Sequence, residues 1–562
     1  MNTYAEIIRT REGDPKVGLR FEGRSWTWEE VVAEAATRAA VLDTFSPGPG
    51  RTQKHVGVLL QNVPDYVFWL LAAGLTGDVL VGVNSTRRGE ELAQDIRHTD
   101  CDLLITEPLY SADLAELALP IPPERVYDIS SEAYAKLLAP HRGASLPQEL
   151  PDPAAMLLLL FSSGSTGAPK AVICTQGRLA ALTGKMTERV SLRRDSVTHL
   201  SMPLFHGNSV MMNLSTAVQV GATIVMVRKF SASGFIRDIH EYDVTFFNYV
   251  GRLLSYILAT PADPRDRDSA LEVAFGSEAS PAEISAFTQR FGVSIREGYG
   301  ASEGIMRITP VPGSPPNSLG RPAEGLTVEL RNEAGEVCPP AQIDEYGMLL
   351  NAAEATGEIV AVGRGAFFEG YYKNPEAMAD RLKGDGQDFW SGDLAYRDPE
   401  GYLYFAGRSS DWIRVDGENF ATAPVERIVS RYTPFTGALG YAVPDPHTGD
   451  QLMLSVLLAE GAVFDPDDFA EFLAAQSDLG TKWKPRFVRV VDTIPMTANG
   501  KVSKIPLRAT GWDAPHVWWM PPRTDAYVPF GHEARAALRA EFHRAGRTAL
   551  LPATPDTSVV NS

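Results

Sequence analysis

A string rich in glycine and hydroxyl groups, directly after an apolar run, is the part of the sequence best suited to chemistry. The run Met156–Phe161 leads into Ser162, Ser163, Gly164, Ser165, Thr166, Gly167, Ala168, Pro169 and Lys170. Glycines let backbone N–H groups converge and hydroxyls add donors, which suits phosphate oxygens. The string is not a Walker loop, because Pro169 stands where that motif needs its second glycine. We therefore predict a phosphate-binding turn after a buried strand.

A second string, Arg296–Gly304, follows another predicted strand. Its Tyr299 has a ring that suits stacking on a base, and Glu303 has the oxygen ligands that Mg²⁺ prefers. Taken alone, a carboxylate in such a turn is more typical of a solvated surface. Upstream, Gly276–Pro281 is by itself ordinary helix-start chemistry.

Two later strings place polar residues at exposed turns. Asp393 stands at a predicted strand edge, where a carboxylate can accept hydrogen bonds from two hydroxyl groups, and Arg408 stands near a predicted domain junction. Lys501 follows Asn499–Gly500, a pair typical of a tight turn, and is therefore expected at a loop tip. Taken alone, Asp393 is also typical of a solvated turn and Arg408 of a surface ion pair, and a single lysine at a loop tip is usually just solvated.

The elements around these strings alternate between strands and helices. Apolar β-rich runs at 55–60, 78–83 and 102–106 are separated by helical patterns, and the alternation returns between residues 221 and 292. Such alternation predicts an α/β fold with doubly wound parallel sheets covered by helices.

The later part of the chain has a different character. Short strands split by Gly, Pro and Asn turns over residues 319–407 predict a small β-barrel-like subdomain. We expect one large N-terminal domain over 1–409, a small α+β domain over 410–551 and a disordered tail over 552–562.

The composition is that of a folded chain. The 562 residues are 44% hydrophobic and 22% charged, which excludes an intrinsically disordered protein. A net charge of −18 argues against a nucleic-acid partner. The longest apolar runs are shorter than the roughly 20 residues of a membrane span. The sparse cysteines Cys101, Cys174 and Cys338, together with no signal-peptide pattern at the N-terminus, predict reduced thiols and a cytoplasmic protein.

Taken in order, the four strings resemble the motifs of the adenylate-forming superfamily of acyl-CoA synthetases, luciferases and peptide-synthetase adenylation domains. The resemblance extends from Trp26 to Arg544. Asn248–Leu258 and Val517–Phe530 resemble more closely the fatty-acid-transport-protein branch of acyl-CoA synthetases. The resemblance implies ATP, Mg²⁺ and coenzyme A as ligands, and a small C-terminal domain that moves. It also implies two half-reactions: a carboxylate attacks the α-phosphorus of ATP, and the CoA thiol then displaces AMP.

The resemblance also implies roles for single positions. The string Ser162–Lys170 holds the β- and γ-phosphates, and Thr166 and Glu303 serve the phosphates and Mg²⁺. The other nucleotide-binding positions are Gly276, Ser277, Glu278, Tyr299, Gly300 and Ser302, with Asp393 and Arg408 on the ribose. Lys501 bridges the substrate carboxylate and the α-phosphate. His206 lies beside the carboxylate and the incoming thiol, and Gly417 lines the CoA tunnel.

By the same analogy, the acid pocket is lined by Asn208, Met211, Met212, Phe247, Asn248, Tyr249, Gly251, Gly304 and Met306. The glycines remove bulk and the aromatic and methionine side chains offer apolar surface. We therefore expect a sizeable hydrophobic carboxylic acid as substrate, either a fatty acid or a polycyclic or terpenoid acid. Each of these apolar side chains is equally typical of a core position.

These assignments predict an AMP-forming carboxylic acid–CoA ligase. One alternative is the same fold catalysing only the CoA transfer from a supplied acyl-adenylate, and another is a ligase that loads a carrier protein. A third is a non-catalytic nucleotide or acyl binder. Gln176, where the family often has His, and Ser410, at the hinge position, leave the first alternative open, whereas Lys501 and Glu303 argue for the complete reaction. The sequence also leaves a homodimer open.

Overall fold

The computed structural model describes most of the chain. The described residues are 1–162, 170–250, 253–279, 281–301, 303–344, 349–408, 412–415, 418–447, 450–476, 479–480, 483–496, 502–522 and 524–552, without the side chains of residues 162, 408, 412, 414, 418, 419 and 421. Candidate residues outside this part are Ser163, Gly164, Ser165, Thr166, Gly167, Gly251, Ser302, Gly417 and Lys501, together with the side chains of Ser162 and Arg408. All but the first residue of the predicted tail also lies outside it.

The chain divides into two compact units. The first comprises residues 1–306 and 366–380, and the second comprises residues 307–365, 381–497 and 501–562.

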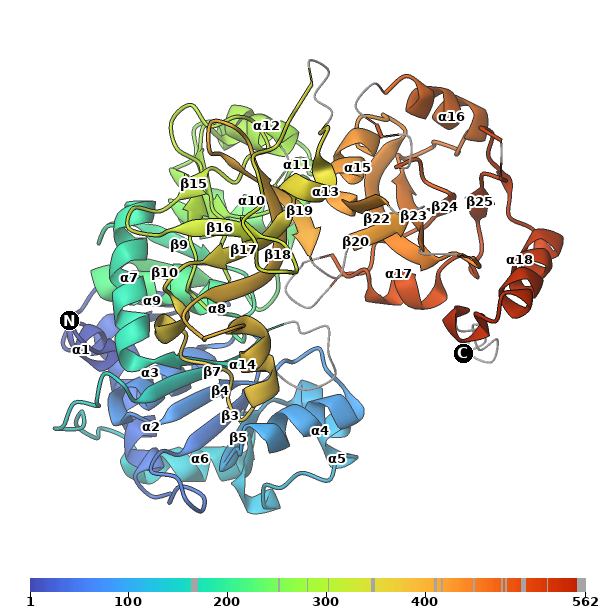
Figure 1. Ribbon diagram of the computed structural model, residues 1–562. Helices are drawn as coiled ribbons and strands as arrows, with labels where there is room; N and C mark the ends of the chain where they lie inside the picture. Colours follow the sequence, from blue (N-terminus) through green and yellow to red (C-terminus); the bar gives the residue numbers. More distant parts are fainter. Residues whose placement is uncertain are drawn as a thin grey trace. The chain divides into compact units, whose positions relative to one another are not determined.

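Two sheets form the first unit (Figure 1). The first sheet has the order β13-β12-β11-β9-β10-β1-β2 and is parallel except for the pair β1–β2. Its strands are β13 (Ser294–Glu297), β12 (Val273–Gly276), β11 (Phe246–Asn248), β9 (Val197–Leu200), β10 (Thr223–Met226), β1 (Val17–Phe21) and β2 (Arg24–Thr27). This arrangement confirms the predicted parallel α/β architecture.

The second sheet has the order β6-β5-β3-β4-β7-β8 and is parallel except for the pair β7–β8. Its strands are β6 (Val126–Asp128), β5 (Leu103–Thr106), β3 (His55–Leu59), β4 (Val79–Gly82), β7 (Met156–Ser162) and β8 (Lys170–Thr175). The buried strand predicted before the glycine-rich string is β7.

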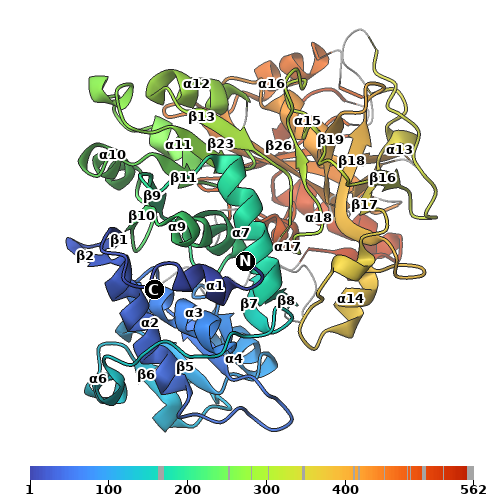
Figure 2. The same cartoon turned by 90° about the vertical axis from the view of Figure 1, so that its left-hand side faces the viewer.

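Helices pack on both faces of each sheet (Figure 1, Figure 2). The helices α3 (Pro64–Thr76), α7 (Gln176–Val190) and α9 (Ser215–Val220) share one apolar core with strands of both sheets. The helices α10 (Ala232–Glu241), α11 (Leu253–Leu258) and α12 (Pro281–Phe291) cover the other face of the first sheet. The helices α4 (Gly89–His98) and α5 (Ser111–Ala115) cover the other face of the second sheet. Burial on both faces explains the near-continuous apolar runs of these strands.

The second unit contains two larger sheets. An antiparallel sheet is formed by β16 (Val328–Arg331), β17 (Gly357–Ala361), β18 (Phe389–Arg397) and β19 (Leu403–Arg408). A five-stranded sheet has the order β22 (Phe435–Pro444), β23 (Asp450–Leu458), β24 (Phe487–Val490), β25 (Val517–Trp519) and β26 (Val528–Pro529). Asp465 caps α16 (Pro466–Ala474) by accepting hydrogen bonds from two backbone N–H groups. Within the described residues, no helix has the length and apolar character that crossing a membrane requires.

Gln176, which departs from the family pattern, has a structural role. Its side chain is fully buried, its Oε1 accepts hydrogen bonds from the backbone of Tyr4 and Ala5, and its Nε2 donates to the carbonyl of Gly74. It thus satisfies N–H groups at the start of α1 (Tyr4–Arg9), which an imidazole of different shape would not reproduce.

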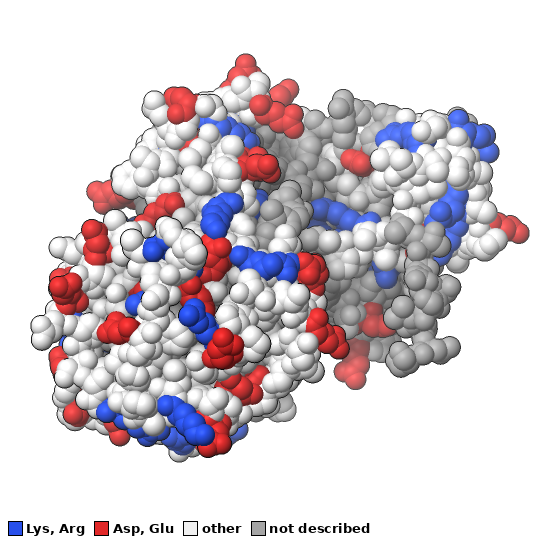
Figure 3. Space-filling model, turned by 90° about the horizontal axis from the view of Figure 1, so that it is seen from below, with Lys and Arg blue, Asp and Glu red and all other residues white. Residues whose placement is uncertain are grey.

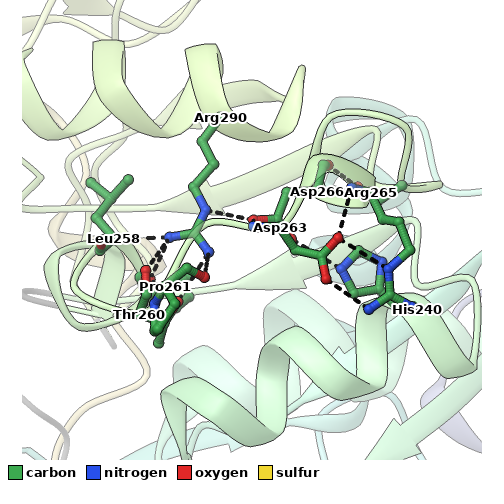
Figure 4. A network of polar contacts seen from close by, with 10 residues as sticks. His240, Leu258, Thr260, Pro261, Asp263, Arg265, Asp266 and Arg290 are labelled. Atoms are coloured by element: carbon green, nitrogen blue, oxygen red, sulfur yellow. Dashed lines mark hydrogen bonds and ion pairs between the residues drawn. The ribbon is translucent and has the colours of Figure 1, made fainter.

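Arg290 of α12 links α12 to the end of α11 and to the segment that follows it (Figure 4). Its guanidinium forms an ion pair with Asp266, whose side chain is 1% exposed. It also donates to the carbonyl oxygens of Ile257, Leu258, Thr260 and Pro261. Carbonyls at and after the end of a helix lack the next turn as a donor, so Arg290 acts as a helix C-cap from outside.

We expect Arg290→Leu to destabilise the protein by about 3–5 kcal/mol, because it leaves the buried Asp266 carboxylate and several carbonyls with one partner fewer. The measurement is the urea midpoint followed by tryptophan fluorescence. The matched control is Arg265→Leu, since Arg265 is 70% exposed in its pair with Asp263. That change is expected to shift stability by less than about 1 kcal/mol. Equal effects of the two substitutions would contradict the assigned role of Arg290.

Candidate functional site

The carboxyl ends of neighbouring parallel strands bring several candidate residues to one edge of the first sheet. The strand β12 ends at Gly276, its neighbour β13 ends just before the Gly298–Gly300 turn, and β11 ends at Asn248. On the far side of β11, β9 leads into the segment that carries His206. Open parallel sheets bind ligands at this edge. The structure therefore places the two predicted nucleotide-binding turns on adjacent strands.

The turn after β12 requires an unusual backbone. A Cβ atom at Gly276 would lie 2.5 Å from the carbonyl oxygen of Tyr249, so a side chain does not fit there. Glu278 has a φ angle of 73°, a left-handed conformation that is strained for a residue with a side chain. Such strain persists only where neighbouring contacts hold it, and it is common at binding sites.

Glu297 supplies those neighbouring contacts. Its Oε1 accepts a hydrogen bond of 2.9 Å from the hydroxyl of Tyr249 and one of 3.0 Å from the backbone N–H of Ala279. Burial raises the pKa of Glu297, although these two hydrogen bonds oppose the shift. One carboxylate thus connects the ends of β11, β12 and β13. The sequence analysis did not select Glu297, whose only signal was its place two residues before Tyr299.

Glu303, the predicted magnesium ligand, is 6% exposed. The hydroxyl of Tyr371 donates a hydrogen bond to its Oε1. A buried carboxylate is stabilised by a cation or by further donors, because burying its charge alone is unfavourable. Magnesium is usually held by one or two carboxylates together with phosphate oxygens. Glu303 fits that mode. Within the described residues, no group of three His, Cys, Asp or Glu side chains could hold a metal ion without such a ligand.

The segment 369–372 positions Tyr371 and was not selected from the sequence. It pairs with β8, because the N–H of Ile173 donates to Gly370 O at 3.1 Å and the N–H of Tyr372 donates to Ala171 O at 2.9 Å. Glu369 accepts from the backbone and hydroxyl of Thr175. This segment lies far from β8 in the sequence, so local patterns contain no sign of the pairing.

The glycine-rich string connects β7 to β8. The two strands pair up to the register partners Ser162 and Lys170, so both ends of the string are held at neighbouring positions of one antiparallel pair. Residues 163–169 lie outside the described part, and the phosphate-binding turn stays a prediction.

His206 follows β9 at the start of the short helix α8 (Gly207–Ser209). Its ring packs on Phe205 with the ring centres 4.3 Å apart. His206 is half-buried, and its place beside a substrate carboxylate stays a prediction.

Three asparagine side chains form a hydrogen-bonded relay beside His206. Asn213, on the π-helix η4 (Val210–Leu214), donates through Nδ2 to His199 O at 3.0 Å and to the Oδ1 of Asn248 at 2.8 Å. Asn248 donates in turn through Nδ2 to the Oδ1 of Asn208. Asn213 and Asn248 are fully buried, whereas Asn208 is half-buried. π-Helices are rare in proteins, and those that occur are frequently found at functional sites.

The other predicted pocket residues divide between core and surface. Phe247 and Tyr249 pack in the core beneath α10 and α12, and Met211 packs in the core that the two sheets share. Met212 is half-buried and Met306 is buried. Gly304 has a φ angle of 66°, and a Cβ there would lie 2.7 Å from a guanidinium nitrogen of Arg178. Phe247, Tyr249 and Met211 therefore contribute to packing, and their place in the acid pocket stays a prediction.

In the second unit, Asp393 of β18 and Arg408 of β19 are register partners across the antiparallel pair. The Asp393 N–H donates to the Ser391 hydroxyl at 3.0 Å. The structure thus brings together the two residues predicted to contact ribose.

On the face shown in Figure 3, acidic and basic side chains are interspersed.

The three cysteines are buried free thiols, as predicted.

Glu297→Gln keeps the Oε1 acceptor for both hydrogen bonds and removes the buried charge. Because burial raises the pKa of Glu297 above its ordinary 4.5, the folded wild-type protein loses stability as the pH rises above that value. The glutamine does not titrate, so we expect the Tm of the variant relative to wild type to increase from about pH 5 to about pH 8. Thermal melts in matched buffers measure this difference. Glu188→Gln, at an exposed position of α7, is the control. A difference for Glu297→Gln that stayed constant with pH would contradict this account.

Comparisons with known proteins agree with this geometry. The profile of the family described as AMP-binding enzyme matches residues 8–372. A steroid-22-oyl-CoA synthetase of Rhodococcus jostii (strain RHA1) is 45% identical over 554 residues, covering 98% of this chain and 99% of the relative. A medium/long-chain-fatty-acid–CoA ligase of Mycobacterium marinum is 40% identical over 503 residues, covering 89% of this chain and 95% of the relative.

Among solved structures, ATP-bound MatB from Rhodopseudomonas palustris has the same fold, with a TM-score of 0.76 at 19% identity over 91% of this chain and 98% of that chain. The predicted α/β fold and the resemblance to adenylate-forming enzymes are both confirmed. With a family profile over most of its length and relatives that match it nearly end to end, the chain belongs to the AMP-binding enzyme family.

Proposed function

We propose that the protein is an ATP-dependent, AMP-forming acid–CoA ligase that activates a hydrophobic carboxylic acid. The observation that carries this proposal is the near-complete coverage by two relatives of at least 40% identity, each named as joining a hydrophobic acid to CoA. The described site supports it, because the candidate nucleotide-binding turns lie on adjacent strands at one sheet edge.

In the adenylation step, the enzyme's own residues orient ATP. The turn Gly276–Glu278, held by Glu297, offers a flat backbone edge to the adenine, and Tyr299 contacts the base from the next strand. Asp393 accepts hydrogen bonds from the ribose hydroxyls, and Arg408 also contacts the ribose. The N–H and hydroxyl groups of residues 163–169 donate hydrogen bonds to the β- and γ-phosphates. When bound, Mg²⁺ would neutralise phosphate charge beside Thr166 and Glu303, and Tyr371 orients the Glu303 carboxylate for that role.

Lys501 provides positive charge between two anions. A carboxylate and a triphosphate repel each other, so their approach requires a fixed cation where charge develops. We assign this role to Lys501. In the second half-reaction, His206 lies beside the acyl carbon and the incoming thiol, and Gly417 leaves room for the CoA arm. We also propose that the region after residue 410 moves between the two half-reactions.

The acid is the least specified part of the function. The names of the two relatives support either a steroid side-chain acid or a medium or long fatty acid. Neither relative is named as a transport protein, and the finer resemblance to the fatty-acid-transport-protein branch stays a prediction.

Exchange of labelled pyrophosphate into ATP and release of AMP with CoA test the proposal. A panel of steroid carboxylic acids, fatty acids, acetate and amino acids is used. We expect exchange and acyl-CoA formation with hydrophobic acids. Acyl-CoA formed only from supplied acyl-adenylate, with no exchange, would favour the transfer-only alternative. Exchange without acyl-CoA would favour a carrier-protein acceptor, and binding without either reaction would favour the non-catalytic alternative.

We expect Lys501→Ala to slow adenylation by about 10²–10³-fold, because it removes the cation that stabilises developing charge. Acyl-CoA formation from supplied acyl-adenylate should stay near the wild-type rate. The two half-reactions are measured separately by pyrophosphate exchange and by CoA consumption. Lys484→Ala is the matched control, since Lys484 pairs with the exposed Asp525 on the surface of the same unit. Adenylation at the parent rate in Lys501→Ala would show that the assigned role is wrong.

A further inference from the structure

The asparagine relay has a fixed direction. A backbone carbonyl can only accept hydrogen bonds, so His199 O requires the Nδ2 group of Asn213 to face it. The second hydrogen on that Nδ2 donates to the Oδ1 of Asn248, which leaves the Nδ2 of Asn248 to donate onward. The orientation of each amide therefore follows from the one before it, beginning at the backbone of β9.

This direction determines which chemical group the relay presents at its outer end. The Oδ1 of Asn208 accepts from Asn248, so the group of Asn208 that remains for other partners is its NH₂ donor. Asn213 and Asn248 are fully buried and Asn208 is half-buried, so the relay runs from the interior to the surface. It ends in a hydrogen-bond donor whose rotation is restrained by a buried chain of bonds.

The donor lies near the reacting end of the acid under the proposed function. Asn208 is two residues after His206, which places the two within about one helical turn of roughly 5.4 Å. Burying the amides of Asn213 and Asn248 is unfavourable unless they form hydrogen bonds, and an all-apolar pocket would need neither of them. The apolar residues Phe247, Tyr249 and Met211 pack in the cores.

We propose that Asn208 is a specificity-determining residue that donates a hydrogen bond to an oxygen atom on the body of the acid substrate. The enzyme then prefers a hydrophobic acid that carries a ketone or similar acceptor oxygen over a purely hydrocarbon acid of the same length. This inference rests on the proposed function and specifies its substrate class.

The test compares hexadecanoic acid with its mono-keto derivatives, which carry one ketone at successive carbons, in the ATP- and CoA-dependent release of AMP. In the wild-type enzyme we expect kcat/KM for the best keto acid to exceed that for the parent acid by about 3- to 10-fold, the size of one net hydrogen bond. Asn208→Leu should lower this ratio to about one through a rise in KM for the keto acids, because only those acids lose a hydrogen bond.

A second variant and a control keep the test independent of folding defects. Asn208→Asp still accepts from Asn248 but replaces the donor by a negative charge, so the ratio should fall below one. Gln219→Met removes an amide of α9 outside the relay, where it accepts from Thr187, and should keep the wild-type ratio.

Three outcomes would contradict the proposal. AMP release by wild type with no keto preference overturns it while leaving the proposed function intact. An equal fall for all acids in Asn208→Leu would mean that the amide serves the carboxylate they share, which also overturns it. AMP release from none of these acids, and from none of the steroid and fatty acids in the panel above, would contradict the proposed function itself and the proposal with it.

Discussion

The two hydrogen bonds accepted by Glu297 are the contacts on which the described part of the site most depends. One comes from the Tyr249 hydroxyl and the other from the Ala279 N–H, so a single carboxylate joins the ends of three neighbouring strands. The left-handed Glu278 and the side-chain-free Gly276 lie within this junction. A strained turn keeps one shape when several contacts determine it, and a turn of fixed shape can bind a ligand without first losing conformational freedom.

The buried polar groups beside the sheet edge also depend on specific hydrogen-bond partners. Glu303 is held by Tyr371, and the asparagine relay is anchored on a backbone carbonyl of β9. Each group loses hydration when it is buried, so each needs a partner in the protein or in a ligand. The direction of the relay shows that burial also determines whether a donor or an acceptor reaches the surface.

Much of the secondary structure could be predicted from local patterns. The β-rich run at 55–60 is observed as β3, and the strand expected before the glycine-rich string is β7. Composition, proline position and capping residues act over a few residues, so their effects can be recognised from the sequence alone. The core roles of Phe247 and Met211 could not be read in this way, because an apolar side chain is equally suited to packing and to lining a pocket until the facing helix is known.

The sequence by itself determined the class of fold and the order of the chemical motifs, because strand and helix periodicity and the glycine-rich and carboxylate-bearing turns are local properties. Only the tertiary structure decided that Glu297 closes the turn after β12, that Tyr371 reaches Glu303, and that three asparagines form a directed relay. These contacts join residues far apart in the chain. Their existence depends on how parallel strands and crossing segments pack in three dimensions, which no local pattern contains.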